Sequence, residues 1–591
     1  RIQNCAVTAR PDAGGDMAIH AYLVGEGKLN MAAVKKELSK TLPVYMIPPY
    51  MMQLPEIPMT KNGKLDYRAL PEIRNQKKGK YIAPGNEREK QICECYEEIL
   101  GAEKVGIRDN FFELGGHSLR AARLQNLLEE KTGVRISLSD VFLNPTPEKL
   151  AELISRENSK EYTPIPKAQE KEYYPMSPAQ KRIYLSCRMD EGGILYNIPQ
   201  AFRIRGAVDA EALRRAFGKM IERHEILRTE FILMGMNLVQ RIREHAEGDF
   251  TVLRDEEKSE EQLIREFVRP FQLASAPLVR ACLVDRGEEW LLLVDMHHIV
   301  SDGMSFGTFM KEWMALYNGV TLKPLKCQFK DYSEWMQNRD LSVQQKYWVE
   351  QFEGEIPVLD MPMDYARPKV QSHEGAVVFR KTGKTLGRKM RKMAAKADAT
   401  PYMVLLSSAM VLLSKYSGQE DIVIGSPAGG RIHRDTEGML GMFVNTLAMR
   451  GKPEGKKSFE EFLREMRESC LRAYENQEYP FEELVEAVKV KRDFSRNPIF
   501  DVLLVLQNNE RVHTYMDGAE ISEVRIRETA VKFDLAFNIS EEDDNFTIGL
   551  EYCTDLYEKA SAEKLLKCFT SILEQVAEQP QLKIEEIEAV R

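Results

Sequence analysis

Two adjacent histidines, His297 and His298, end an apolar run in the stretch LLLVDMHHIVSDGMS, and Asp302 and Gly303 follow closely. A neutral imidazole, with an ordinary pKa of about 6.5, can accept a proton or a hydrogen bond near neutral pH. Successive side chains of a strand point to opposite faces, so only one of the two rings can face a cavity. The pattern predicts one reactive and one supporting histidine, with Asp302 orienting a ring or pairing with an arginine, and Gly303 allowing a tight turn and close approach of the backbone to a substrate.

Two other roles for the histidine pair stay open on the residues alone. Both could be ordinary structural histidines, or they could bind a metal ion together with Asp302. Adjacent histidines on a strand cannot easily share one ion, and the sequence shows no third cluster of ligands. We therefore expect no metal here.

A second stretch, DNFFELGGHSLRAARL, places Ser118 after two glycines and at the start of a helical pattern that ends at Gly133. The N-terminus of a helix and the N–H groups of a flexible loop favour an incoming phosphate. Ser118 could instead be only a helix cap. A catalytic pair of His117 and Ser118 is not expected, because adjacent side chains at a helix start diverge.

The chain has 591 residues, which suggests several domains, and 43% hydrophobic and 29% charged residues, as in ordinary globular proteins. Its formal charge of -8 argues against nucleic acid as a partner. The sequence has no run of eighteen apolar residues, so no membrane span is expected. The nine cysteines are scattered, and we expect buried, reduced thiols.

The elements that must position these residues fall into three regions separated by polar linkers. Residues 1–74 mix short apolar runs with one helix over 30–42, and a linker over 75–82 follows. Residues 83–157 have helical periodicity, with helices expected from 87 to 101, from 118 to 133 and from 146 to 158. A second linker spans 158–170. From 171 to 591, strands and helices alternate, which predicts an α/β region with a first lobe over about 171–345 and a second over about 346–591.

The stretch HHIVSDG resembles the HHxxxDG signature of condensation domains of nonribosomal peptide synthetases. Further motifs follow the family's order along the chain: SPAQKRIYL (177–185), RHEILRTEF (223–231), DYSEW (331–335), IGSPAGGR (424–431), GMFVNTLAMR (441–450), YPFEELV (479–485) and RDFSRNPIFDVLL (492–504). The resemblance implies two chloramphenicol-acetyltransferase-like lobes in a V. It also implies that His298 faces a tunnel between them, His297 supports it, Gly303 lies beside the thioester, and Asp302 is structural, with Arg431 as its candidate partner.

The stretch DNFFELGGHSL resembles the attachment site of peptidyl carrier proteins from the same synthetases. The resemblance implies a four-helix bundle with 4'-phosphopantetheine on Ser118. Residues 1–74 resemble the small α+β C-terminal subdomain of an adenylation domain, with TKNGKLD as the motif and Lys64 as its catalytic lysine. The large ATP-binding subdomain has no counterpart here, so ATP and magnesium would act only in the parent synthetase, and Lys64 would be idle in this chain.

The combined resemblance implies a cytoplasmic, monomeric, peptide-bond-forming acyltransferase. A donor thioester on the carrier would react with the amine of an acceptor on a downstream carrier, with no metal required. The implied partners are a phosphopantetheinyl transferase, the upstream adenylation core and modules, and the downstream carrier, and neither nucleic acid nor membrane. An epimerisation domain of the same fold, a non-catalytic carrier and docking scaffold, and an acyltransferase using free coenzyme A are the alternatives.

Overall fold

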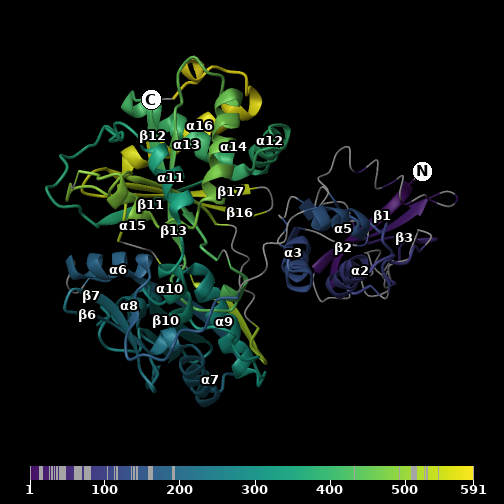
Figure 1. The fold of residues 1–591 in the computed structure, drawn as a ribbon, viewed down its shortest axis with the longest axis horizontal. Coiled ribbons are helices and arrows are strands. Elements are labelled where there is room, and N and C mark those ends of the chain that lie inside the picture. Colours follow the sequence, from purple (N-terminus) through teal and green to yellow (C-terminus); the bar gives the residue numbers. More distant parts are fainter. Residues whose placement is uncertain are drawn as a thin grey trace. The chain divides into compact units, whose positions relative to one another are not determined.

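In the computed structural model the chain divides into two units, residues 1–164 and 165–591 (Figure 1). The structure describes residues 2–11, 17–25, 27, 29, 31, 34, 38, 48, 50–58, 70–71, 81–102, 104–111, 114, 118–134, 136, 140–141, 144–156, 164–189, 193–431, 433–491, 493–507, 515–524, 526, 530–542 and 545–589.

The first unit begins with a three-stranded sheet made of β1 (Ile2–Pro11), β2 (Met17–Gly25) and β3 (Tyr50–Gln53). β1 and β2 are antiparallel, and β3 pairs parallel to β2. Tyr22 of β2 is buried, and its hydroxyl donates to the Pro71 carbonyl at 2.6 Å. The helix expected over 30–42 lies mostly outside the described residues.

Three helices of the first unit lie where the sequence predicts them, namely α2 (Glu87–Leu100), α3 (Ser118–Thr132) and α5 (Pro147–Arg156). Asn86 caps α2 by accepting the Glu89 N–H, and Gly101 ends the helix with φ near 64°. Gly133 has a φ of 71° and ends α3 in the same way. The apolar faces of the helices share one core, in which Tyr96 and Phe111 are fully buried and meet edge to face.

The first half of the second unit is built on a five-stranded sheet with the order β15-β5-β10-β9-β8. These strands are β15 (Ala519–Val524), β5 (Asn197–Gly206), β10 (Trp290–His297), β9 (Val279–Asp285) and β8 (Asp249–Arg254). All neighbours are antiparallel except β8 and β9. A small sheet of β4 (Tyr174–Pro175), β7 (Asn237–Ile242) and β6 (Thr229–Met234) accompanies it. The helices of this half are α6 (Pro178–Met189), α7 (Ala210–Arg223), α8 (Glu260–Phe267), α9 (Gly303–Tyr317) and α10 (Phe329–Gln337).

The second half contains a six-stranded sheet with the order β11-β17-β16-β14-β12-β13. Its strands are β11 (Gly375–Lys381), β17 (Asn545–Cys553), β16 (Leu535–Glu542), β14 (Val502–Gln507), β12 (Ile422–Ala428) and β13 (Asn445–Gly451). The helices are α11 (Ser342–Gln351), α12 (Lys384–Lys396), α13 (Pro401–Ser417), α14 (Phe459–Glu475), α15 (Phe481–Ala487) and α16 (Lys559–Glu578). Thr400 caps α13, and the residues from Met403 to Ser414 are all buried, so this helix forms the centre of the second core.

Two segments from the later part of the chain join the earlier half. β15 pairs with β5 and so completes the first sheet. Met439, Leu440, Met442 and Phe443 pack in the first core rather than the second. A lobe boundary near residue 345 therefore separates the two halves only along the chain. In the packed structure, segments from after residue 345 belong to the first half.

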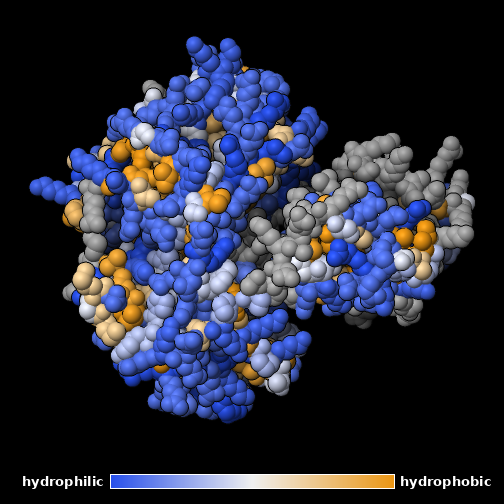
Figure 2. All heavy atoms as spheres, viewed as in Figure 1, coloured by the Kyte–Doolittle hydropathy of each residue, from blue (hydrophilic) through white to orange (hydrophobic). Residues whose placement is uncertain are grey.

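Within the described residues, no single helix meets the length and hydropathy needed to cross a membrane, although α12 and α13, bent by 102°, meet it as a pair. The surface in Figure 2 is largely hydrophilic, with separate apolar patches. One group of exposed apolar side chains lies at the β6–β7 hairpin, where Met236 is 97% exposed.

Candidate active site

The histidine pair lies at the end of β10, at the point where the chain leaves the sheet. β10 ends at His297, and His298 begins the turn that leads to α9. The His297 N–H donates to the Leu278 carbonyl at 3.0 Å, and the His298 N–H donates to the Tyr196 carbonyl at 2.7 Å. Only His297 lies on the strand, so the rule that strand side chains alternate between two faces does not set the direction of the His298 ring. Hydrogen bonds to neighbouring segments nevertheless fix the backbone N–H groups of both histidines.

His297 is a buried supporting residue. Its Nδ1 accepts the Ile299 N–H at 3.1 Å, so the ring proton belongs on Nε2, which lies 3.6 Å from the Cys187 Sγ. The ring of Phe271 meets it edge to face at 6.0 Å. Burial, and after it the charge of Lys532, lowers the pKa of His297 to about 3. His297 is thus a neutral side chain that shapes the turn by holding the Ile299 backbone.

A buried ion pair lies near His297 and was missed by the sequence analysis. Asp295, two residues earlier on β10, lies 3.2 Å from the Arg280 guanidinium, which in turn covers the Phe271 ring at 3.6 Å. Burial raises the pKa of Asp295 to about 7, although Arg280 opposes the shift. The sequence did contain a signal for this ion pair. Arg280 and Asp295 are single charged residues inside the apolar runs LVRACLVD and WLLLVDMHH, and a charge in a buried strand needs a partner.

His298 has the imidazole that is free for a ligand. The ring keeps partial surface exposure, but its Nδ1 is buried and has no hydrogen-bond partner among the described residues. Desolvation by the surrounding protein lowers the pKa of His298 well below its ordinary value, and Lys532, His297 and Arg182 act in the same direction. The ring is therefore uncharged at neutral pH and can accept a hydrogen bond.

Asp302 connects the turn to two other segments. It is fully buried and caps α9, because its Oδ1 accepts the Ser305 N–H at 2.8 Å. Its Oδ2 accepts the Phe443 N–H at 3.0 Å. Gly303 is the exposed first residue of α9 and is not among the glycines with positive φ. The expected tight turn does not explain this glycine, whereas its exposed backbone leaves room for a close approach.

Arg431 lies next to Asp302, as the sequence analysis suggested, but most of its contacts are with other groups. Its Nη2 is 3.9 Å from the Asp302 Oδ1 and donates to the Ser305 Oγ at 2.7 Å. The guanidinium covers the Phe443 ring at 4.1 Å. Burial lowers the pKa of Arg431, and Asp302 opposes this. Arg431 therefore stabilises the junction as much through Ser305 and Phe443 as through its long ion pair.

A pocket near the turn collects residues from motifs that are far apart in the sequence. It is lined by Ser177, Pro178, Ala179, Tyr332, Met336, Gly430, Met442, Phe443, Val444, Asn445, Gln477, Glu478, Pro480 and Glu482. His298 is not part of this lining. The connection runs through Gln180, which is fully buried: its Nε2 donates to the Ile299 carbonyl at 3.2 Å and its Oε1 accepts the Ser177 N–H at 3.0 Å.

The two remaining predicted residues belong to the first unit. Ser118 is the first residue of α3, the fifteen-residue helix, so its backbone lies at a positive helix end that suits a phosphodiester. The preceding residues 115–117 and Lys64 lie outside the described residues. His297, His298, Asp302, Gly303 and Arg431, by contrast, come together in the second unit. Within the described part of the chain, no group of three or more His, Cys, Asp or Glu side chains could hold a metal ion.

Comparison with known proteins assigns both regions. The condensation domain family matches residues 170–591, and the phosphopantetheine attachment site family matches residues 90–154. Bacitracin synthase 3 of Bacillus licheniformis is 40% identical over 593 residues, which cover 99% of this chain and 9% of the synthase. Bacitracin synthase 1 of the same organism is 41% identical over 599 residues, covering 100% of this chain and 11% of that protein. The chain thus spans about a tenth of the length of these relatives.

Among solved structures, the X-domain from teicoplanin biosynthesis is similar, with a TM-score of 0.67 and 25% identity over 72% of this chain and 100% of that one. The chain therefore belongs to the condensation-domain family, and it also contains a phosphopantetheine attachment site domain.

Proposed function

We propose that the second unit joins a donor thioester on the attachment domain to the amine of an acceptor on a downstream carrier, with His298 as the residue that meets the amine. The single observation that supports this role best is the unpaired, buried Nδ1 of an imidazole whose backbone is held on both sides. Buried polar atoms normally have partners, so this imidazole nitrogen still has the capacity to accept a hydrogen bond. In this proposal the two lobes form a V, and a tunnel passes His298.

The neutral form of His298 determines what it can do for the amine. An uncharged ring accepts an N–H from the incoming amine and holds the nitrogen in line with the thioester carbonyl. The depressed pKa makes the ring a weak base, so we assign it more to orientation than to full proton removal. Aminolysis then forms the amide C–N bond and breaks the C–S bond, and the amine proton and the thiolate together leave a free thiol.

We propose Ser118 as the attachment residue, within a carrier of four helices over residues 83–157. Its place at the first position of α3 supports this, because a helix N-terminus stabilises the phosphodiester of an attached group. When attached, 4'-phosphopantetheine supplies the thiol that carries the donor acyl group as a thioester. The rest of the reaction is carried by the second unit, in which His297, Asp302 and Arg431 hold the turn in place.

Residues 1–74 would be the C-terminal subdomain of an adenylation domain, with Lys64 as the lysine that acts on the acyl adenylate in the parent protein. The three-stranded sheet over β1, β2 and β3 is compatible with this assignment. The partners in this proposal are a phosphopantetheinyl transferase, the upstream adenylation core and modules, and a downstream acceptor carrier. We also propose that the protein is monomeric and cytoplasmic and that it binds neither membrane nor nucleic acid.

The test uses the full chain, loaded at Ser118 by a phosphopantetheinyl transferase with an aminoacyl-pantetheine. A carrier-bound or soluble amine is added, and amide and donor stereochemistry are followed by mass spectrometry and chiral analysis. The proposal expects amide from wild type and about a hundredfold less from His298→Ala, in line with the loss of a contact that positions the amine. Racemised donor would show an epimerisation domain instead, and neither product from any acceptor would show a scaffold. A Ser118→Ala chain that still gains the pantetheine mass would refute the attachment site.

A further inference from the structure

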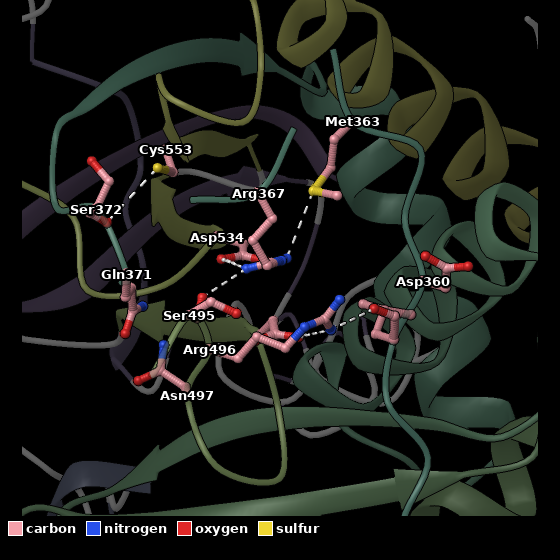
Figure 3. Close-up of polar contacts among 12 residues, drawn as sticks. Asp360, Met363, Arg367, Gln371, Ser372, Ser495, Arg496, Asn497, Asp534 and Cys553 are labelled. Carbon is pink, nitrogen blue, oxygen red and sulfur yellow. Dashed lines mark hydrogen bonds and ion pairs between the residues drawn. The ribbon is translucent and has the colours of Figure 1, made fainter. Parts of the chain in front are cut away.

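The segment over residues 530–534 crosses between the two halves of the second unit and is held firmly by the second half. The Val531 N–H donates to the His373 carbonyl at 2.9 Å, and the His373 Nδ1 lies 2.9 Å from the Val531 carbonyl. The Asp534 carboxylate binds both Nη atoms of Arg367 (Figure 3). The segment therefore has a fixed backbone on both sides of Lys532.

The backbone of Lys532 itself is fixed by two amide side chains. The Lys532 carbonyl accepts the Nε2 of Gln371 at 3.0 Å and the Nδ2 of Asn497 at 2.9 Å. Figure 3 shows both amides close to the Arg367–Asp534 pair, with Asn497 next to Arg496. A carbonyl held by two donors and followed by a buried ion pair cannot shift easily, so the start of the Lys532 side chain is well defined.

The Lys532 side chain reaches the first half of the unit, where the histidines lie. Its Nζ lies 4.8 Å from the centre of the Tyr196 ring, a cation–π contact. Tyr196 is also the residue whose carbonyl accepts the His298 N–H, and its ring centre lies 6.4 Å from that of His297. Lys532 thus contacts the residue that anchors His298.

Two arginines near the two rings each form an ion pair. Arg182 lies 2.9 Å from Glu482, and Arg280 lies 3.2 Å from Asp295. Lys532 is the charge with the largest lowering effect on the pKa of both His297 and His298, after burial. Arg182 contributes less at His298, and Arg280 less at His297.

We propose that Lys532 is a positioning residue for condensation: the second half of the unit places its ammonium against Tyr196, which anchors His298, and there the charge adds to burial in disfavouring protonation of the ring that accepts an N–H from the incoming amine. The inference rests on the proposed role of His298. The segment 530–534 would then take part in the reaction, because a movement of the two halves away from each other would move the Lys532 ammonium away from the histidines.

The first test is the pH profile of amide formation by the full chain, measured from the lowest pH at which the chain stays folded to pH 8.5. Removing a cation raises the pKa of a neighbouring histidine, so activity should be lost at a higher pH on the acidic side. We expect Lys532→Met to move the acidic limb up by about one pH unit and Lys532→Glu by up to about two units. Lys532→Arg should keep the wild-type limb, and rates at pH 8.5 should stay within about threefold for Lys532→Met.

Lys330→Met is the matched control, because Lys330 also lies over a tyrosine, 5.3 Å from the Tyr174 ring centre, and pairs with Glu225 at 3.0 Å. It should leave the acidic limb unchanged. The inference is overturned if Lys532→Met and Lys532→Glu keep the wild-type limb, whatever their rates, because a merely structural lysine would change the rate alone.

The second test does not depend on turnover. Histidine labelled with carbon-13 at Cε1 is followed by NMR through a pH titration, and His298→Gln assigns the signal. The His298 midpoint should rise in Lys532→Met and not in Lys330→Met. A raised midpoint in a chain that forms no amide would refute the proposed function and leave only the effect of the Lys532 charge on His298, whereas an active chain with an unmoved midpoint would refute the role of Lys532.

Discussion

Asp302 accepts the backbone N–H of Phe443 at 3.0 Å, so the aspartate of the histidine motif holds a segment that comes 141 residues later in the chain. Its other oxygen caps α9. The same carboxylate therefore fixes the direction of the helix after the histidine turn and the position of the Phe443 segment. A side chain with two such tasks is structural, even though it lies four residues from His298.

Asp302→Asn should keep the helix cap and lose the Phe443 contact, because an amide has only one oxygen to accept hydrogen bonds. We expect a loss of about 1–3 kcal/mol in the free energy of unfolding, and more for Asp302→Ala, which leaves both N–H groups without a partner. All four tryptophans (290, 313, 335 and 348) lie in the second unit, so tryptophan fluorescence during urea unfolding reports this unit alone. Equal losses for the asparagine and alanine variants would contradict the two-task assignment.

His297 should be replaceable by a residue that still accepts the Ile299 N–H. Asparagine places an oxygen near the position of Nδ1, whereas leucine fills space without accepting a hydrogen bond. We expect His297→Leu to be less stable than His297→Asn by about 1–3 kcal/mol, the cost of an unsatisfied buried N–H. The comparison uses the same fluorescence measurement. A leucine variant as stable as the asparagine variant would show that the Nδ1 contact does not stabilise the turn.

Gln180 should act on the reaction through the turn it holds. Gln180→Leu removes the partners of the Ile299 carbonyl and the Ser177 N–H while keeping similar volume. We expect about a tenfold lower kcat with little change in KM, since a misplaced His298 weakens contacts made in the transition state. Leu185→Ala, at an exposed position of α6, is the control and should keep the wild-type kcat. A change in KM alone would place Gln180 in substrate binding instead.

Asp501 should make the second unit less stable as pH rises. Burial, with the nearby Asp534 adding to it, raises the pKa of Asp501 to about 6, above the ordinary value near 4. The folded chain therefore holds this proton more tightly than the unfolded chain, and stability falls as pH rises from about 4 to about 6. Asp501→Asn imitates the protonated form and can still accept from Arg496, which now donates to Asp501 at 2.8 Å.

The stability of Asp501→Asn relative to wild type should therefore increase by about 1–3 kcal/mol between pH 4 and pH 7.5. Urea unfolding followed by tryptophan fluorescence at a series of pH values measures this difference. The exposed Asp555→Asn should show no such trend. A relative stability of Asp501→Asn that does not change with pH would mean that the carboxylate is as easily ionised in the folded chain as in the unfolded one.

The sequence was sufficient for the elements whose signals are local. The helices expected from 87 to 101 and from 118 to 133 lie within a residue of α2 and α3, and the strands and helices expected to alternate after residue 171 are present, β5, α7 and β10 among them. Their apolar periodicity is set by the face each presents to a core. The expectation that both histidines lie on the strand was wrong by one residue, because the Val300 N–H turns back to the His297 carbonyl.

The relationships that the sequence could not supply are those between distant segments. β15 reads as a short alternating strand, and nothing local states that its partner is β5, more than 300 residues earlier. Gln180 and Lys532 are ordinary polar residues until the fold brings them to the turn and to Tyr196. Arg431 was identified only because a resemblance pointed to its motif, and its contacts with Ser305 and Phe443 depend on the packed structure.

The pairing of β15 with β5 bears on any attempt to divide or recombine this protein. A polypeptide cut after residue 345 would lack β15 and present the main-chain groups of β5 to solvent, and such an open edge invites aggregation. Exchange of the later half with that of a relative would need a replacement for this strand as well as for the residues that meet Asp302. Residues 165–591 should therefore be kept together when the protein is divided or recombined, because β15 of the later half completes the sheet of the earlier half.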